Sequence, residues 1–182
     1  MKVINTKLPG VLIIKPKVTI DKRGFFKEAF QANRYFDAGI TLPFVQENYS
    51  RSKRGVLRGL HFQKTRPQGK LVSCIFGSIY DVVVDIDPNS KTFSNYIGVQ
   101  LSDKNHLQLW IPPGYAHGFC VLSEYADFFY KCTNFYFPED EHGIIWNDPD
   151  VSINWPVKSP LLSSKDKLLP RLSKMLKALI TK

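Results

Sequence analysis

Hydrophobic and polar side chains alternate along much of this chain, and the alternation predicts β-strands. In IYDVVVDID, residues 79–87, Tyr80 and Val82 share one face while Asp81 and Val83 share the other. A repeat of two residues is typical of an extended strand, because successive side chains point to opposite faces. We expect this segment to be a strand with two unlike faces.

A second alternating stretch, DFFYKCTNFYF at residues 127–137, predicts that Tyr130 and Tyr136 face the same way. Turn signals such as DPNS and IPPGYAHG separate the extended segments from one another. Many short strands divided by turns favour a mostly antiparallel sandwich or barrel. The other segments with strand character are 10–15, 44–50, 71–76, 96–101 and 107–111.

Helical periodicity is limited to residues 33–38 and to a clearer stretch near the C-terminus. There Leu172, Met175, Leu176 and Leu179 follow the spacing i, i+3, i+4, i+7. The outer face of this helix is basic, which favours docking on the β-structure with lysines in water over binding to a membrane or nucleic acid. With 182 residues and no internal repeat or linker, the chain is expected to form one domain.

Composition excludes several function classes. The longest apolar runs are far below the ~18 residues that a membrane helix needs, and lysines and prolines interrupt the N-terminal segment where a secretory signal would be apolar. Cys74, Cys120 and Cys132 lie far apart and form no CxxC pair, so we expect buried, reduced thiols. These features together predict a cytoplasmic protein.

The net charge of +9 is concentrated in one segment. Residues 51–70 hold seven basic side chains and no acidic one, whereas residues 71–164 hold four basic and eleven acidic side chains. Such a cluster attracts an anion, which could be nucleic acid, an acidic membrane surface or a phosphorylated small substrate; it could equally be a solvated basic face. The glycines between the basic residues and the lack of a stripe with stacking aromatic residues argue against nucleic acid.

Two histidines have neighbours that suggest chemistry. His61 lies in RGLHFQ, where arginines could hold a phosphate close to the imidazole, and His117 follows the turn PPGYA, which is expected at the rim of a barrel. Metal-binding cupin barrels carry two histidines one residue apart, but the second position here is Gln63. The remaining imidazoles are too few for a tight iron, manganese or zinc site, so no metal is expected. A metal cupin acting as an oxygenase or sensor stays as an alternative.

Seven segments occur in an order that resembles one known family. They are DKRGFFKEAF, FVQENYSRSKRGVLRGLHFQ, QGKLVSCIFGSIYDVVVDID, WIPPGYAHGF, YKCTNFYFPEDEHGIIWNDP, INWP and LSSKD. In this order they are similar to the motifs of the dTDP-4-dehydrorhamnose 3,5-epimerase family, from about Asp21 to Asp166. Departures are mild: Asp87 stands where arginine is common, and the tail after Asp166 is not distinctive.

The resemblance implies an all-β fold, a cupin-like antiparallel jelly-roll barrel over about 1–160 with short peripheral helices, followed by a helical segment over about 161–182. It also implies a homodimer that uses no metal or organic cofactor. The substrate would be dTDP-4-dehydro-6-deoxy-D-glucose, inverted at C3 and C5 through enolates to give dTDP-4-dehydro-L-rhamnose for dTDP-L-rhamnose biosynthesis. A single-site epimerase or ketoisomerase acting on a related dTDP-4-keto-6-deoxy sugar is the alternative. Neither nucleic acid nor a membrane is an expected partner.

Four catalytic residues follow from the resemblance. His61 would be the base, since an ordinary histidine pKa of ~6.5 lies near working pH. Asp166 would orient this imidazole and stabilise its protonated form, as in other His–Asp pairs, although the residues alone favour a helix N-terminus at this position. Tyr130 would return a proton on the opposite face of the sugar, and Lys70 would stabilise the enolate oxygen or hold the sugar.

The resemblance also implies a set of substrate contacts. Guanidinium groups suit a diphosphate, and the ring of Tyr136 suits stacking on thymine. Residues 46–48, QEN, match contacts with the nucleotide. The implied binding residues are Arg23, Glu28, Gln46, Glu47, Asn48, Arg58, Lys70, His117, Tyr136, Glu141 and Lys165.

Arg58 and His61 pose a geometric problem, because residues three apart on a regular strand face opposite sides. A bulge at Gly59 could turn one side chain toward the other. Arg58 could instead serve the partner's pocket in a dimer. We favour the bulge.

Overall fold

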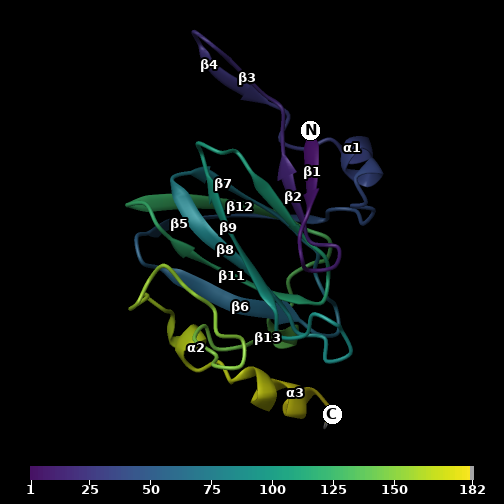
Figure 1. Cartoon of the computed structure of the whole chain (residues 1–182), viewed down its shortest axis with the longest axis vertical. Coiled ribbons are helices and arrows are strands. Elements are labelled where there is room, and N and C mark those ends of the chain that lie inside the picture. Colours follow the sequence, from purple (N-terminus) through teal and green to yellow (C-terminus); the bar gives the residue numbers. More distant parts are fainter. Residues whose placement is uncertain (181–182) are drawn as a thin grey trace.

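The computed structural model describes residues 1–180, and within them most strands belong to two antiparallel sheets that face each other (Figure 1). A separate hairpin, β3 (Val18–Asp21) and β4 (Gly24–Lys27), extends from one end of the molecule. The six-stranded sheet has the order β1 (Lys2–Asn5), β2 (Leu12–Lys15), β10 (Gln108–Ile111), β7 (Lys70–Phe76), β12 (Tyr125–Cys132), β5 (Gln46–Lys53). The five-stranded sheet has the order β13 (Glu141–Gly143), β6 (Leu57–Gln63), β11 (Tyr115–Val121), β8 (Ser78–Asp85), β9 (Tyr96–Ser102).

The main core lies between the two sheets. Val72 and Phe128 from the six-stranded sheet pack there with Ile79, Val83 and Phe119 from the five-stranded sheet. All five side chains are at most 4% exposed, so their burial supplies much of the hydrophobic stabilisation of the fold. The sheets are therefore held together as one sandwich.

The C-terminal segment covers the outer face of the five-stranded sheet. Val82 on β8 and Ile144 after β13 pack there with Trp155, Leu172 and Met175. Both faces of β8 are consequently covered. Neither face is solvated, although the two faces carry different side chains. The helices are α1 (Ala32–Asp37), the 3-10 turn η1 (Pro138–Asp140), α2 (Ser164–Lys167) and α3 (Leu172–Ile180).

The predicted C-terminal helix is confirmed as α3. Leu172 and Met175 are buried and Leu176 is partly buried against the same cluster, as the periodicity predicts; the side chain of Leu179 lies outside those that are described. Among the described residues, no helix is both long and apolar enough to cross a membrane.

One predicted strand ends earlier than the alternation indicates. β12 stops at Cys132, because the chain turns at residues 133–134, where the Gly69 N–H donates to Thr133 Oγ1 at 2.8 Å. Tyr136 therefore lies in a loop and not on the strand of Tyr130. The prediction of one continuous strand over 127–137 is wrong, although both tyrosines still line one cavity.

The predicted bulge on β6 is confirmed. His61 pairs with His117 and Arg58 pairs with Phe119, so three steps on β6 match two steps on β11. Gly59 has a φ of +120°, a conformation that side chains with a Cβ rarely adopt. The extra residue turns Arg58 and His61 toward the same cavity.

Gly59→Ala is expected to lower the free energy of unfolding by at least about 3 kcal/mol, because the strain of a positive φ adds to a steric clash. An added Cβ would lie 2.6 Å from Gly118 Cα and 2.8 Å from the His117 carbonyl oxygen. Gly39→Ala is the matched control, since Gly39 also has a positive φ but open space around it. Denaturant unfolding of both variants measures the difference; equal losses would show that β6 does not need this close approach.

Candidate active site

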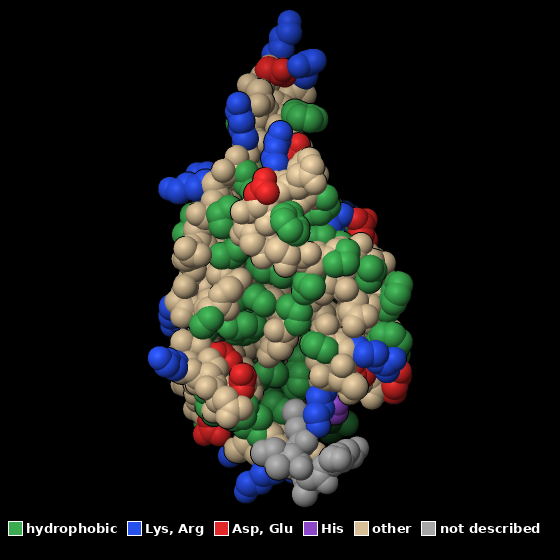
Figure 2. Space-filling model, turned by 90° about the vertical axis from the view of Figure 1, so that its right-hand side faces the viewer, with side chains coloured by type: hydrophobic (Ala, Val, Ile, Leu, Met, Phe, Trp, Pro, Cys, Tyr) green, Lys and Arg blue, Asp and Glu red, His purple; other side chains and the backbone are tan. Residues whose placement is uncertain are grey.

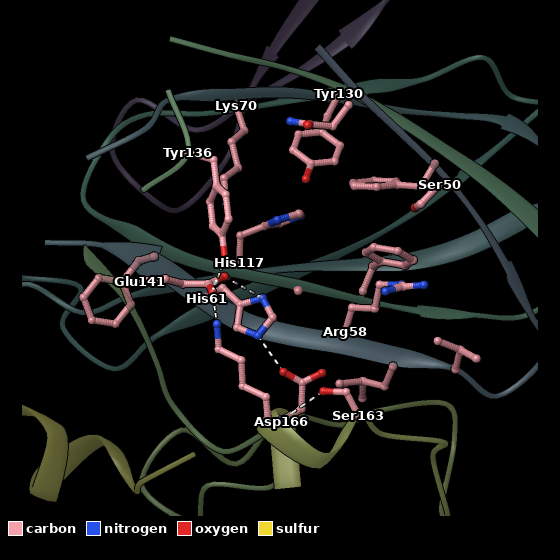
Figure 3. A pocket seen from close by; sticks show the side chains of 18 of the residues that line it. Ser50, Arg58, His61, Lys70, His117, Tyr130, Tyr136, Glu141, Ser163 and Asp166 are labelled. Atoms are coloured by element: carbon pink, nitrogen blue, oxygen red, sulfur yellow. Dashed lines mark hydrogen bonds and ion pairs between the residues drawn. The ribbon is translucent and has the colours of Figure 1, made fainter. Parts of the chain in front are cut away.

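A cavity with a volume of about 850 Å³ lies between the two sheets. Its walls come from β5, β7 and β12 on one side and from β6 and β11 on the other, and residues 161–166 form part of its rim. A cavity of this size accommodates a drug-sized or nucleotide-sized ligand. The side chains at its centre are mainly ionisable (Figure 3).

His61 projects from the bulged strand β6 and contacts a carboxylate. Its Nε2 lies 2.6 Å from Asp166 Oδ1, and the two side chains are 24% and 5% exposed. With the Nε2 proton donated to Asp166, the other ring nitrogen, Nδ1, is free to accept a proton. The pair therefore has the geometry of an oriented base (Figure 3).

Asp166 is held by the short helix α2. The Asp166 N–H donates to Ser163 Oγ at 3.0 Å, so Ser163 caps this helix and fixes the backbone that carries the carboxylate. Burial raises the pKa of Asp166, but the hydrogen bonds from His61 and Ser163 and the positive charge of Lys165 outweigh burial and lower it overall. Asp166 is thus ionised, as a partner for an imidazolium must be.

Tyr130 reaches the cavity from β12, in the sheet opposite His61 (Figure 3). Burial raises the pKa of Tyr130 to about 12. The phenol is therefore protonated at neutral pH and has a proton to donate. A ligand between the sheets would have the imidazole on one face and the phenol on the other.

Lys70 and His117 lie near the middle of the cavity, on β7 and β11. Burial lowers the pKa of Lys70 against the opposing effect of Cys132 and Asp81. His117 Nε2 lies 3.0 Å from both carboxylate oxygens of Asp81, which is fully buried. Lys70 and His117 thus bring side-chain nitrogen atoms to the part of the cavity that lies between the two sheets.

Glu141 connects three of the predicted residues. Its Oε1 lies 3.7 Å from His61 Nδ1, its Oε2 accepts the Tyr136 hydroxyl at 2.9 Å, and Lys165 Nζ contacts the same oxygen. The ring of Tyr136 is thereby tied to the neighbourhood of the base (Figure 3). One end of the cavity thus combines an aromatic face with a lysine.

Arg58 lies on the other side of His61 from Glu141 (Figure 3). It donates two hydrogen bonds to Ser52 Oγ, at 3.2 and 3.1 Å. Gln46 and Asn48 line the cavity from β5, and the Gln46 amide donates to Asn48 Oδ1 at 3.0 Å. The basic side chain and the amides are placed where a nucleotide could contact them.

Three predicted binding residues do not line this cavity. Arg23 pairs with Asp21 at 2.6 Å in the projecting hairpin, and Glu28 pairs with Arg34 at 2.8 Å. Glu47 faces away from Gln46 and Asn48 and contacts Lys131. Within a single chain, none of the three therefore lines the cavity with the other predicted site residues.

Sequence reasoning assigned no role to Asp81 and Ser163, which orient His117 and Asp166. The alternation in residues 79–87 already put Asp81 on the partly acidic face of its strand. A repeat of two residues does not show which side chain of another strand Asp81 contacts. Ser163 precedes Asp166 by three residues, the spacing of a helix cap, and that signal was available in LSSKD. In the described residues, no cluster of three or more His, Cys, Asp and Glu side chains could hold a metal ion. Gln63 directs its amide to backbone groups.

Comparison with known proteins identifies the family. The sequence model of the dTDP-4-dehydrorhamnose 3,5-epimerase family matches residues 5–174. The chain belongs to this family. A relative named dTDP-4-dehydrorhamnose 3,5-epimerase, from Shigella flexneri, is 54% identical over 168 residues, which cover 91% of this chain and 93% of the relative.

Two further members place the chain within the dTDP-4-dehydrorhamnose 3,5-epimerase family. The crystal structure of dTDP-6-deoxy-D-glucose-3,5-epimerase from Legionella pneumophila, in complex with dTDP-4-keto-L-rhamnose, superposes with a TM-score of 0.92 at 52% identity and covers 94% of this chain and 93% of its own. A dTDP-4-dehydrorhamnose 3-epimerase from Streptomyces niveus is 38% identical over 161 residues, 87% of this chain and 78% of that protein. Identity is thus higher to these two 3,5-epimerases than to this 3-epimerase.

Proposed function

We propose that this chain is a dTDP-4-dehydrorhamnose 3,5-epimerase, which converts dTDP-4-dehydro-6-deoxy-D-glucose to dTDP-4-dehydro-L-rhamnose in dTDP-L-rhamnose biosynthesis. The observation that carries the proposal is the His61–Asp166 pair on one sheet facing the protonated Tyr130 on the other. Inversion of a carbon centre needs a proton removed from one face and another delivered to the opposite face. A base and an acid on facing sheets meet this requirement.

The chemistry begins at the carbon next to the C4 ketone. Nδ1 of His61 takes the hydrogen from C5 or C3, and the electron pair moves into the ketone to form an enolate. Lys70 and His117 face the enolate oxygen and stabilise its negative charge, while Asp166 stabilises the imidazolium. The Tyr130 hydroxyl then protonates the carbon from the other side and becomes a phenolate. Proton exchange with water removes the proton from His61 and returns one to Tyr130, so the same sequence at the second carbon completes the double inversion.

The nucleotide occupies the remainder of the cavity. Arg58 provides positive charge for the diphosphate, Lys165 is a further substrate contact, and the ring of Tyr136 stacks on the thymine base. Gln46 and Asn48 contact the nucleotide from β5. No metal or organic cofactor takes part in these steps.

Incubation with dTDP-4-dehydro-6-deoxy-D-glucose in heavy water tests the function. We expect deuterium to enter the sugar at both C3 and C5, with dTDP-4-dehydro-L-rhamnose as the product, as followed by NMR and mass spectrometry. Exchange and inversion at only one carbon would instead identify a single-site epimerase, and a shift of the ketone would identify a ketoisomerase. Activity that tracks stoichiometric bound iron or zinc would identify a metal cupin.

A homodimer is part of this proposal and is supported by the hairpin β3–β4. Ile20, Phe25 and Phe26 on this hairpin are 77%, 59% and 75% exposed, although large apolar side chains gain from burial. Figure 2 shows the hairpin extending from the body with basic side chains at its tip. Because Arg23 and Glu28 lie outside their own cavity, their contact with substrate requires the cavity of a second copy.

Phe25→Ser combined with Phe26→Ser is expected to convert the dimer into a monomer and to weaken dTDP binding about tenfold, since each serine removes apolar area from the interface. Analytical ultracentrifugation measures the mass, and titration calorimetry measures the affinity. Phe36→Ser on α1 is the control, because Phe36 is 58% exposed but lies outside the hairpin. A wild-type protein that sediments as a monomer would refute the dimer.

The proposed function goes together with a particular β-fold and a particular cellular compartment. We assign the two antiparallel sheets and the cavity between them to a cupin-like jelly roll. The shared core between the sheets and the packing of α3 on the five-stranded sheet support a single epimerase domain over residues 1–182. Three buried, free cysteines are consistent with the cytoplasm as the place of reaction.

A further inference from the structure

The side-chain amide of Gln63 is almost completely buried at the end of β6, where only 4% of the residue is exposed. An unpaired amide in such a place would be costly, so its hydrogen-bond partners matter. Nε2 donates to the carbonyl oxygens of Arg66 and Phe135, at 2.7 and 3.1 Å, and Oε1 accepts from the Phe137 N–H at 2.8 Å. Both the NH₂ group and the oxygen of the amide are thus hydrogen-bonded to backbone groups of neighbouring loops.

Two of these hydrogen bonds flank Tyr136, because they hold the residues immediately before and after it. Residues 135–137 have no regular secondary structure, and Phe135 and Tyr136 are 56% and 46% exposed. Neither a strand ladder nor deep burial fixes this segment. The Tyr136 N–H itself donates to Gln46 Oε1 at 2.8 Å. Three consecutive residues are therefore bonded to two glutamines, Gln63 on the five-stranded sheet and Gln46 on the six-stranded sheet.

We propose that Gln63 is a positioning residue for recognition of the nucleotide base: it holds the loop 135–137 so that the ring of Tyr136 is already in place when the nucleotide binds. This inference rests on the proposed function, in which Tyr136 stacks on the base. A pre-organised ring does not lose conformational freedom on binding, so the nucleotide binds more tightly. Gln63 never touches the reacting carbons in this scheme.

Glutamine has the functional groups that this task needs. Its NH₂ group serves two carbonyl oxygens while its own oxygen serves one N–H, and no other side chain except asparagine offers that combination. A histidine at this position, as in metal-binding cupins, has no carbonyl oxygen to accept from Phe137 while donating to two carbonyls. The position two residues after His61, which metal cupins use for a ligand, therefore holds a binding loop in this protein.

The test begins with Gln63→Met, which keeps an unbranched side chain of similar length and removes all three hydrogen bonds. We expect the affinity for dTDP to fall about tenfold, because the loop must be ordered at the moment of binding. The affinity for inorganic pyrophosphate should stay within about twofold, since that probe lacks a base. With substrate, KM should rise while kcat stays within about twofold, as expected when binding but not chemistry is affected.

Gln108→Met is the matched control for general destabilisation. Gln108 is also 4% exposed and does not line the cavity; its amide donates to the Ala29 carbonyl and accepts from the Tyr35 hydroxyl. We expect it to lower thermal stability without changing the ratio of dTDP affinity to pyrophosphate affinity. A change of that ratio in both variants alike would overturn the inference. If Gln63→Met does not fold, Gln63→Glu replaces it, because the carboxylate keeps the acceptor for Phe137 and loses both donors.

A double-mutant cycle with Tyr136→Ala shows whether Gln63 acts through Tyr136. In the Tyr136→Ala background, Gln63→Met should weaken dTDP binding by less than about twofold, since the ring to be positioned is gone. A full tenfold loss in that background would overturn the positioning role. Tyr136→Ala with unchanged dTDP affinity would refute base stacking, and the inference with it. A weakened Tyr136→Ala beside an unaffected Gln63→Met would refute the positioning role alone.

Discussion

Replacement of His61 by alanine is expected to reduce turnover by about 10³- to 10⁴-fold, because it removes the base that starts each inversion. Deuterium incorporation at C3 and C5 should fall in parallel, since both exchanges need the same imidazole. The affinity for dTDP should change by less than about twofold, because the nucleotide contacts come from Arg58, Lys165 and Tyr136. Rapid-quench assays, NMR in heavy water and titration calorimetry measure the three quantities.

Two companion variants separate the roles of the neighbours of His61. Asp166→Asn keeps the shape of the residue but removes the charge that stabilises the imidazolium, so kcat should fall while dTDP still binds. Arg58→Ala should weaken dTDP binding as well as activity, because a guanidinium contact with the diphosphate is lost. Full activity of His61→Ala would refute the assignment of the base.

Tyr130→Phe is expected to lower formation of the inverted product by about 10²- to 10³-fold while some exchange continues at the first carbon. The phenylalanine ring keeps the shape of the cavity wall, but the proton donor on the face opposite His61 is gone. His61 can still remove a hydrogen and return one to the same face, which produces exchange without inversion. The diagnostic result is deuterium in the unconverted substrate, detected by NMR.

Tyr115→Phe is the control for Tyr130→Phe. Burial also raises the pKa of Tyr115 to about 12, and its hydroxyl donates to the Pro9 carbonyl at 2.8 Å, but it does not line the cavity. This variant should retain wild-type product formation. Equal inhibition in both variants, or normal inversion by Tyr130→Phe, would exclude Tyr130 as the acid.

The sequence predicted the strands whose alternation reflects a buried and a less buried face, such as β8 and β12. It did not predict the hairpin β3–β4, because exposed aromatic residues mixed with charges give no periodic signal. The alternation correctly indicated that Tyr136 faces the same cavity as Tyr130, but it wrongly put Tyr136 on the same strand. Tyr136 lies in a loop that is held by hydrogen bonds to Gln46 and Gln63.

Local motifs were enough to place residues in the cavity wall, whereas the long-range contacts between these residues could not be predicted. RGLHFQ was enough to single out His61, and a glycine between Arg58 and His61 was enough to suggest the bulge. The residues alone favoured a helix N-terminus for Asp166, and this interpretation is also correct, because the first turn of α2 carries the carboxylate to His61. The partnership of Asp81 with His117 depends on strand order, which a periodic pattern does not contain.

The two members of the His61–Asp166 pair are separated by 105 positions in the chain, and the acidic member lies close to the C-terminal end. During synthesis the imidazole leaves the ribosome long before its carboxylate does. A nascent or truncated polypeptide that stops short of α2 would therefore carry a base without its orienting partner. If this pair is the base of the proposed reaction, enzymatic activity requires that α2 has docked beside β6.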